Sequence, residues 1–217
     1  MARLLETTFL AGPAGRLEAL HEGPDDGERI RRAAVVCHPH PQFGGTLHNK
    51  VVFRLARAAR TAGSAVLRFN FRGVGQSGGA YDEGRGEQDD VRAAIAYMKD
   101  RYPGLPLTVA GFSFGSAVGL RASCGDAEVE RFVAAGAPVD KWKFDFLRSC
   151  GLPKIFIHST RDEYGSRENL EKTFALAAEP KKLVWVEAQD HFFAGALDEF
   201  EAAAQQAFSS EGWGAST

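Results

Sequence analysis

The sequence predicts an α/β fold with a doubly wound, mostly parallel sheet of eight strands and helices on both faces. Two observations lead to this prediction. Short apolar runs alternate with amphipathic runs along most of the 217 residues. The runs at 33–38 and 65–71 are also continuously apolar at their centres, which is typical of strands that are covered on both faces.

The apolar runs define the predicted strands. The first two follow each other with no helical pattern between them or directly after them, so we expect the chain to open with two strands before the repeated strand–helix units begin. The predicted strands are Leu4–Leu10, Arg16–His21, Ala33–His38, Ala65–Phe71, Leu107–Gly111, Phe132–Gly136, Lys154–Ser159 and Leu183–Glu187.

Apolar residues recur at three- and four-residue intervals between the later runs, as they do along one face of a helix. Each such pattern predicts a helix that covers the sheet. The patterns lie at Val51–Ala59, Val91–Met98, Leu170–Ala177 and Leu197–Ala207, and a further small-residue helical stretch follows Ser113.

Composition limits the classes of function. An apolar content of 44% is enough for one sizeable core, so we expect a single domain over residues 1–208 and a loose tail over residues 209–217. The net charge is −2 and no basic patch runs along the chain, which argues against a nucleic-acid partner. No apolar run approaches the roughly 18 residues of a membrane span, and the N-terminus lacks the continuous apolar core of a signal peptide. The oligomeric state is not indicated.

The chain has three cysteines, Cys37, Cys124 and Cys150. Three widely spaced cysteines cannot all pair with one another, and their spacing is not that of a metal-ligand cluster. We therefore expect a reducing, cytoplasmic location.

Gly73, Gly75 and Gly78 form a G-x-G-x-x-G pattern, which is the phosphate-binding signature of dinucleotide folds. That signature must lead directly into a helix whose N-terminus faces the pyrophosphate. Here the next helical pattern begins only near Glu87, after a run of turn residues. The pattern therefore favours a long glycine-rich loop at the carboxyl end of a strand, and no cofactor is expected.

A second glycine motif contains a candidate catalytic serine. Ser113 lies in G-x-S-x-G between an apolar strand and a small-residue helical stretch. A sharp strand-to-helix turn of this kind exposes the serine hydroxyl above the sheet and places a helix N-terminus beneath it. We interpret Ser113 as a nucleophile. The alternative is a serine that only caps the following helix.

A serine nucleophile needs a base and a carboxylate to orient that base. In folds with this turn the chain order is serine, acid, histidine. His191 follows the last predicted strand in a loop, where a base is expected, whereas His158 lies within a strand. Asp162 is the predicted acid, Glu163 is the second choice, and Asp190 is interpreted as a turn former.

The amide of Phe114, directly after the nucleophile, is a predicted donor to the oxyanion. The loop after the third strand should supply the second donor, and Pro39 and Pro41 cannot, because they have no N–H. We predict Gln42 for this role, with Phe43 as the alternative.

The same loop raises the possibility of a metal site. His38, His40 and His48 could in principle bind one, but no carboxylate lies among them. No metal is expected, and we interpret His38 and His40 as hydrogen-bonded supports of the loop.

Four segments resemble signatures of one family of small bacterial α/β-hydrolases, grouped loosely with dienelactone hydrolase. They read HPHPQFGGTLHNK, FNFRGVGQSGG, GFSFG and DHFF, and the resemblance runs from about Ala33 to about Phe200. It implies an α/β-hydrolase fold and a serine hydrolase. Dienelactone hydrolase itself uses a cysteine nucleophile, whereas residue 113 is serine, so its substrate class does not carry over.

We therefore expect a carboxylic-ester hydrolase that acts on a small-molecule substrate through Ser113, His191 and Asp162. A thioesterase, a small peptidase or an acyltransferase would use the same residues. A non-catalytic binding scaffold is the alternative of another class. The segment 137–153, where many hydrolases of this fold insert a lid, has room for only one short helix. No cap domain is expected, and residues such as Trp142 form an apolar rim or pack on the core.

Overall fold

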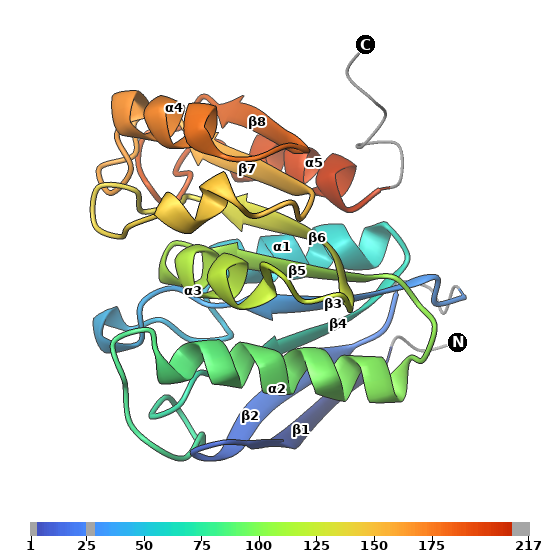
Figure 1. Cartoon of the computed structure of the whole chain (residues 1–217). Coiled ribbons are helices and arrows are strands. Elements are labelled where there is room, and N and C mark those ends of the chain that lie inside the picture. The colour runs from blue at the N-terminus through green and yellow to red at the C-terminus, as the bar shows by residue number, and fades with distance from the viewer. Residues whose placement is uncertain (1–3, 25–28, 210–217) are drawn as a thin grey trace.

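The computed structural model describes residues 4–24 and 29–209. Its centre is an eight-stranded sheet with the strand order β1-β2-β4-β3-β5-β6-β7-β8 (Figure 1). The strands are β1 (Leu5–Gly12), β2 (Gly15–Glu22), β3 (Arg32–Cys37), β4 (Ser64–Phe69), β5 (Leu107–Phe112), β6 (Val129–Ala135), β7 (Lys154–Ser159) and β8 (Lys181–Val186).

Strand pairing is antiparallel at the start of the chain and parallel in the rest of the sheet. β1 pairs with β2, and β2 with β4, in antiparallel fashion. All the other neighbouring strands are parallel. The prediction of a doubly wound, mostly parallel eight-stranded sheet is confirmed. The eight predicted strands are all present, and β7 has the predicted bounds.

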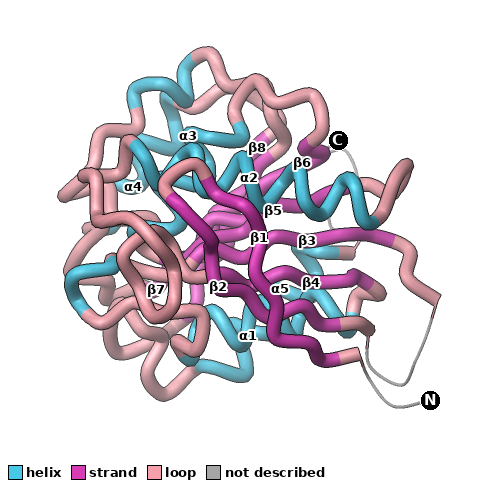
Figure 2. Tube along the Cα trace, turned by 90° about the horizontal axis from the view of Figure 1, so that it is seen from below, coloured by secondary structure: helices cyan, strands magenta, loops and turns pink. Residues whose placement is uncertain are grey.

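Helices cover both faces of the sheet (Figure 2). They are α1 (Lys50–Thr61), α2 (Gly86–Arg101), α3 (Phe114–Ser123), α4 (Arg167–Leu176) and α5 (Leu197–Phe208), with short 3-10 helices at Pro41–Phe43 and Asp145–Arg148. Buried residues of α1 and α5 form one core with one face of the sheet. Those of α2, α3 and α4 form a second core on the other face. The described residues contain no cap domain, and the segment 137–153 holds only the 3-10 helix Asp145–Arg148.

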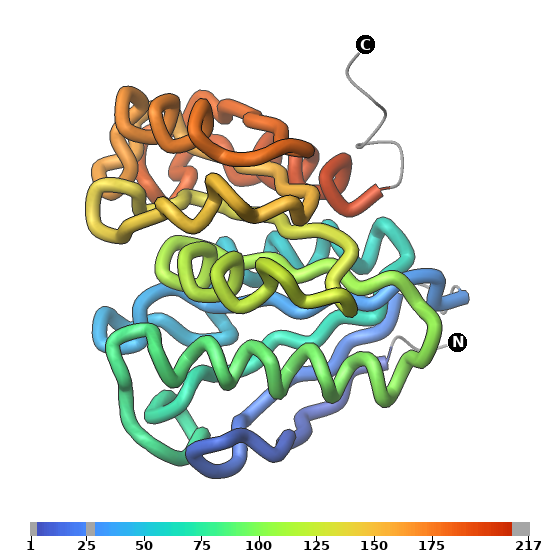
Figure 3. The backbone as a smooth tube through the Cα atoms, viewed as in Figure 1, coloured from blue at the N-terminus to red at the C-terminus, as the bar shows by residue number. Residues whose placement is uncertain are grey.

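The order of the strands reverses near the middle of the sheet, where β4 lies on one side of β3 and β5 to β8 follow on the other side. The backbone trace passes from the antiparallel strands at one edge to β7, β8 and α5 at the other (Figure 3). The predicted tail at 209–217 lies outside the described residues from position 210 onward, so that prediction is not tested. No helix within the described ranges has the length and hydropathy needed to span a membrane.

Buried charges anchor the antiparallel strands to the loop that follows β3. Glu22 accepts hydrogen bonds from Arg60 and Arg68, each at 2.6 Å. Arg68 also donates to the carbonyl oxygen of Leu47, and the Asn70 side chain accepts from the Leu47 amide. A buried ionic group is tolerated only when partners satisfy it, and here those partners hold residue 47 in place.

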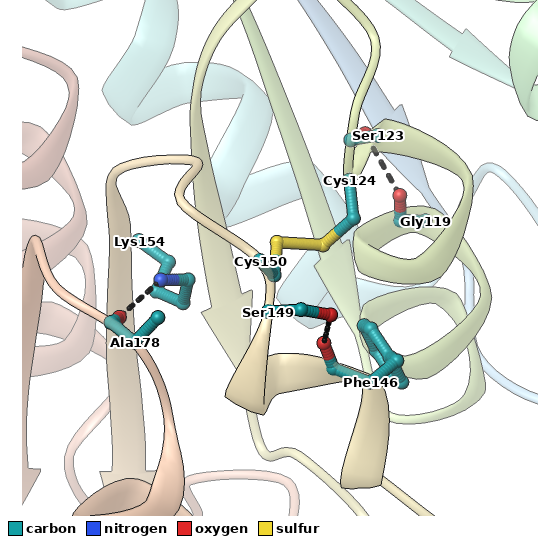
Figure 4. Close-up of a disulfide and its surroundings, with 8 residues drawn as sticks. All are labelled: Gly119, Ser123, Cys124, Phe146, Ser149, Cys150, Lys154 and Ala178. Atoms are coloured by element: carbon teal, nitrogen blue, oxygen red, sulfur yellow. Dashed lines mark hydrogen bonds between the residues drawn. A yellow bond between two sulfur atoms is a disulfide. The ribbon is translucent and has the colours of Figure 1, made fainter.

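Cys124 and Cys150 form a disulfide (Figure 4). Cys124 directly follows α3 and Cys150 lies just after the Asp145–Arg148 helix, so the bond fastens the segment 137–153 to α3. Two of the three cysteines therefore pair, which agrees with the statement that all three cannot, but it removes the ground on which a reducing location is expected. Only Cys37 is free, and it is buried. Cysteine usage thus no longer favours a reducing compartment.

We expect the disulfide to contribute to stability. Closing a loop of this sequence separation restricts the unfolded chain by about 3 kcal/mol in the chain-entropy model. Reduction should therefore lower the melting temperature by roughly 5–10 °C. Thermal unfolding with and without a reductant measures this. The double variant Cys124→Ser/Cys150→Ser is the control, and it should already melt at the lower temperature and show no response to reductant. An unchanged melting temperature on reduction would contradict the prediction.

Candidate active site

The turn between β5 and α3 places Ser113 in a strained backbone conformation. Its φ is 54° and its ψ is −121°, values that non-glycine residues rarely adopt. The Ser113 amide donates to the carbonyl oxygen of Ala135 on β6, and its carbonyl oxygen accepts from the Ser116 amide. A strained backbone conformation typically costs about 1–3 kcal/mol, and it persists because surrounding hydrogen bonds such as these hold the residue.

The two glycines of the motif are needed because backbone passes where their side chains would be. A Cβ on Gly115 would lie 2.5 Å from the carbonyl oxygens of Cys37 and His38 at the end of β3. A Cβ on Gly111 would collide with the backbone of Gly115 and Ser116. The first turn of α3 therefore packs directly on the ends of β3 and β5, and any larger residue would push the serine out of position.

His191 and Asp162 meet at the carboxyl ends of β8 and β7. Nδ1 of His191 lies 2.7 Å from Oδ2 of Asp162, and both side chains are buried. Oδ1 of Asp162 accepts from the amides of Tyr164 and Gly165. A carboxylate held in this way accepts the Nδ1–H and leaves Nε2 as the free acceptor of the imidazole. Nε2 of His191 is buried and has no hydrogen-bond partner among the described residues.

The two alternative acids bind backbone instead of imidazole. Oε2 of Glu163 accepts from the His191 amide at 3.0 Å. Oδ1 of Asp190 accepts from the amides of Phe192 and Ala194, each at 2.9 Å, which confirms its interpretation as a turn former. Of these three carboxylates, Asp162 is the one that contacts the His191 ring.

A cavity of about 410 Å³ joins Ser113 and His191. Most of the side chains around it are aromatic or small. The lining residues are Pro39, His40, Phe43, Gly44, Gly45, Asn49, Ser113, Phe114, Pro138, Lys141, Trp142, Tyr164, His191 and Phe192. The segment 137–153 contributes three of them, so it forms part of the rim. Trp142 is the expected rim residue, while Phe144 and Leu147 are buried in the core.

The predicted oxyanion donors have different outcomes. Phe114 lines the cavity, and its amide is at the N-terminus of α3, where no helical acceptor exists. Gln42 does not line the cavity, and its amide donates to Nδ1 of His40. Phe43 lines the cavity, but its amide donates to the carbonyl oxygen of His40. The structure therefore does not bring the Gln42 amide to the site, because the Pro41–Phe43 turn directs it onto the preceding histidine.

The His40 amide is a donor that the sequence reasoning passed over. His40 lines the cavity, and its N–H makes no hydrogen bond within the described residues. Its position was readable from the sequence, because His40 is the one residue with an N–H between Pro39 and Pro41.

The histidines of this loop support it, as expected. Nδ1 of His38 lies 2.6 Å from the carbonyl oxygen of Pro39, and Nε2 accepts from the Phe71 amide. Burial lowers the pKa of His38 to about 4, so it is neutral and ties the end of β3 to the residues after β4. Nε2 of His40 lies 3.2 Å from the Tyr81 hydroxyl. The described residues contain no group of three or more His, Cys, Asp or Glu side chains arranged to hold a metal ion.

The glycine-rich loop after β4 is a turn, and α2 begins only at Gly86, so the arrangement of a dinucleotide site is not formed there. The Gly73 amide donates to the carbonyl oxygen of Gly78, which closes the loop on itself. The side chain and the amide of Arg72 both bind Asp90 on α2. The loop is thus fixed between β4 and α2.

Comparisons with known proteins agree with the fold described above. A family model described as the alpha/beta hydrolase fold matches residues 35–150. Protein RP471 of Rickettsia prowazekii (strain Madrid E) is 30% identical over 204 residues, covering 90% of this chain and 85% of RP471.

Two solved structures are similar over nearly their whole length. XC6422 from Xanthomonas campestris, described as an a/b serine hydrolase without lid, is 35% identical with a TM-score of 0.86, covering 93% of this chain and 92% of XC6422. An alpha-beta serine hydrolase homologue from Coxiella burnetii is 32% identical with a TM-score of 0.88, covering 93% of this chain and 96% of the homologue. The fold, the strained serine turn and these matches together place the chain in the alpha/beta hydrolase fold family.

Proposed function

We propose that this protein is a serine hydrolase that cleaves small carboxylic esters through a triad of Ser113, His191 and Asp162. One observation carries the proposal. Nδ1 of His191 is bound to Asp162, and its buried, unpartnered Nε2 belongs to a residue that lines the same cavity as Ser113. This is the arrangement of a base with an orienting acid beside a nucleophile.

The reaction follows from these positions. Oγ of Ser113 attacks the ester carbonyl carbon while Nε2 of His191 takes the hydroxyl proton, and the Asp162 carboxylate stabilises the imidazolium. The carbonyl oxygen gains negative charge, and the amides of Phe114 and His40 donate to it. The C–O bond to the alcohol then breaks, and His191 gives the proton to the leaving oxygen.

Water completes the cycle. His191 removes a proton from a water molecule that attacks the acyl-enzyme, and the ester bond to Ser113 breaks as Oγ regains its proton. The strained turn and the N-terminus of α3 keep Oγ and the Phe114 amide fixed relative to each other throughout. Such preorganised donors need no rearrangement when charge develops, which is the main source of stabilisation in reactions of this type.

Replacement of Ser113 by alanine tests the proposal directly. Ser113→Ala should keep the fold and lose hydrolysis of p-nitrophenyl acetate by at least ~10³-fold, since only binding and the oxyanion donors remain. Labelling by a fluorophosphonate probe, with peptide mapping of the modified residue, should find Ser113 in the wild type and nothing in the variant. A non-catalytic scaffold predicts no labelling of the wild type. A variant that keeps more than about a tenth of the rate would identify another nucleophile.

The three carboxylates around His191 should differ sharply in importance. Asp162→Asn should lower kcat on the order of 10³-fold, because an amide favours the wrong imidazole tautomer and cannot stabilise the imidazolium. Glu163→Gln and Asp190→Asn should each cost less than about 10-fold, because both residues only accept from backbone amides and an amide oxygen can still do so. Steady-state rates of the three variants measure this. A larger loss for Glu163→Gln than for Asp162→Asn would show that the acid is Glu163.

The open site should favour short acyl chains. Phe43 and Tyr164 line the cavity and are 84% and 40% exposed, and the segment 137–153 is a rim and not a cover. Each methylene contributes about 0.8 kcal/mol to binding only when protein covers it, so kcat/KM should rise over about C2 to C6 and then level off. A p-nitrophenyl ester series extended to about C12, with matched thioesters and peptides as a comparison panel, measures this. A continued rise to the longest chain would reveal a covered acyl tunnel.

A further inference from the structure

A second histidine lies against the carboxylate of the proposed triad. His158 is fully buried on β7, and its Nε2 lies 2.7 Å from the carbonyl oxygen of Gly165 and 3.4 Å from Oδ2 of Asp162. Its position within a strand is not the loop position where the base is expected. The serine, its base and its acid, as proposed above, give it no role, yet it contacts the oxygen of Asp162 that binds His191.

The surroundings of His158 determine which nitrogen of its ring carries the hydrogen. Nε2 faces two acceptors, the Gly165 carbonyl and the Asp162 carboxylate, so it must carry the hydrogen. Nδ1 is buried with no hydrogen-bond partner among the described residues, so a second N–H there would be unsatisfied. Burial is also the largest influence on the pKa of His158 and lowers it, in spite of the nearby Asp162. His158 is therefore a neutral imidazole with its hydrogen on Nε2.

The contact closes the turn that carries the acid. The Gly165 amide donates to Oδ1 of Asp162, while the Gly165 carbonyl accepts from His158. A Cβ on Gly165 would lie 2.9 Å from Cε1 of His158, so the turn and the ring pack without space between them. Trp185 on β8 contacts the ring of His158 edge-on and limits its rotation. The carboxylate of Asp162 thus has Oδ1 bound by the turn and Oδ2 between two imidazoles.

We propose that His158 is a positioning residue for Asp162. Its Nε2–H holds the 162–165 turn through Gly165 and flanks Oδ2 of Asp162, which keeps that oxygen directed at Nδ1 of His191. The proposal rests on the proposed function, because His158 acts only through the acid and the base of that triad. Without this N–H the carboxylate can rotate, and small errors in the placement of a catalytic group can cost on the order of 10²-fold in rate.

Three variants separate positioning from simple destabilisation. In His158→Gln the side-chain amide keeps an N–H at the same number of bonds from the backbone as Nε2 of the histidine. His158→Leu has no N–H in its side chain. His21→Leu is the matched control, because His21 is also fully buried and bound through Nε2, in its case to the Tyr102 hydroxyl, far from the site. His158→Leu should lower kcat by about 10–100-fold with little change in KM. His158→Gln should restore kcat to within about 5-fold of the wild type, and His21→Leu should keep the wild-type kcat while it loses stability.

Two nitrogen-15 NMR measurements on histidine-labelled protein keep the proposal falsifiable if a variant fails to fold. In the wild type at neutral pH, His158 should be neutral with its hydrogen on Nε2. The downfield Nδ1–H resonance of His191, assigned by its loss in Asp162→Asn, should persist in His158→Gln and shift or broaden in His158→Leu. A charged His158, the Nδ1–H tautomer, or a His158→Leu variant with unchanged kcat would each overturn the proposal. Because the NMR signals do not depend on turnover, they remain informative if Ser113→Ala shows that the proposed hydrolysis is wrong.

Discussion

The close contact between the first turn of α3 and the end of β3 is the constraint on which the site depends. It places the backbone of Gly115 against the carbonyl oxygens of Cys37 and His38, with no room for a side chain. The chain can make this approach only by passing through the strained conformation of Ser113. The same approach brings the free amide of Phe114 close to the loop that carries His40. The positions of the proposed nucleophile and of its proposed oxyanion donors thus follow from one packing contact.

A second constraint comes from the strand order. Ser113 follows β5, whereas Asp162 and His191 follow β7 and β8, so the end of β6 lies between Ser113 and the other two residues. The imidazole of His191 must therefore cross the end of β6. Gly136 makes this possible: a Cβ there would lie 3.1 Å from Cε1 of His191, and the φ of Gly136 is +52°. Phe112 on β5 packs against the same ring. Gly136 and Phe112 thus fix where the ring of His191, the proposed base, can lie.

The sequence predicted the sheet well because buried parallel strands leave continuous apolar runs, and it pointed to Ser113, Asp162 and His191 because each lies in the turn or loop at the carboxyl end of a strand. It favoured Asp162 over Glu163 but could not show which carboxylate meets the ring, since neighbouring side chains point in different directions and only the turn to Gly165 fixes this. It also missed the pairing of Cys124 with Cys150, because that pairing depends on the path of the segment 137–153. Gln42 failed for a local reason, the tight turn at Pro41 that returns its amide to His40.

The segment 137–153 links helix α3, which follows Ser113, to the turn that carries Asp162. At one end, the backbone turn after Pro138 brings Lys141 and Trp142 to the cavity, and the Asp140 amide donates to the carbonyl oxygen of Tyr164, in the turn that follows Asp162. At the other end, Cys150 is bonded to the residue that directly follows α3. The rim of the cavity is therefore fixed to the helix that follows Ser113 and to the turn that carries Asp162. A segment held at both ends keeps the shape of this side of the cavity although it contains only one short 3-10 helix.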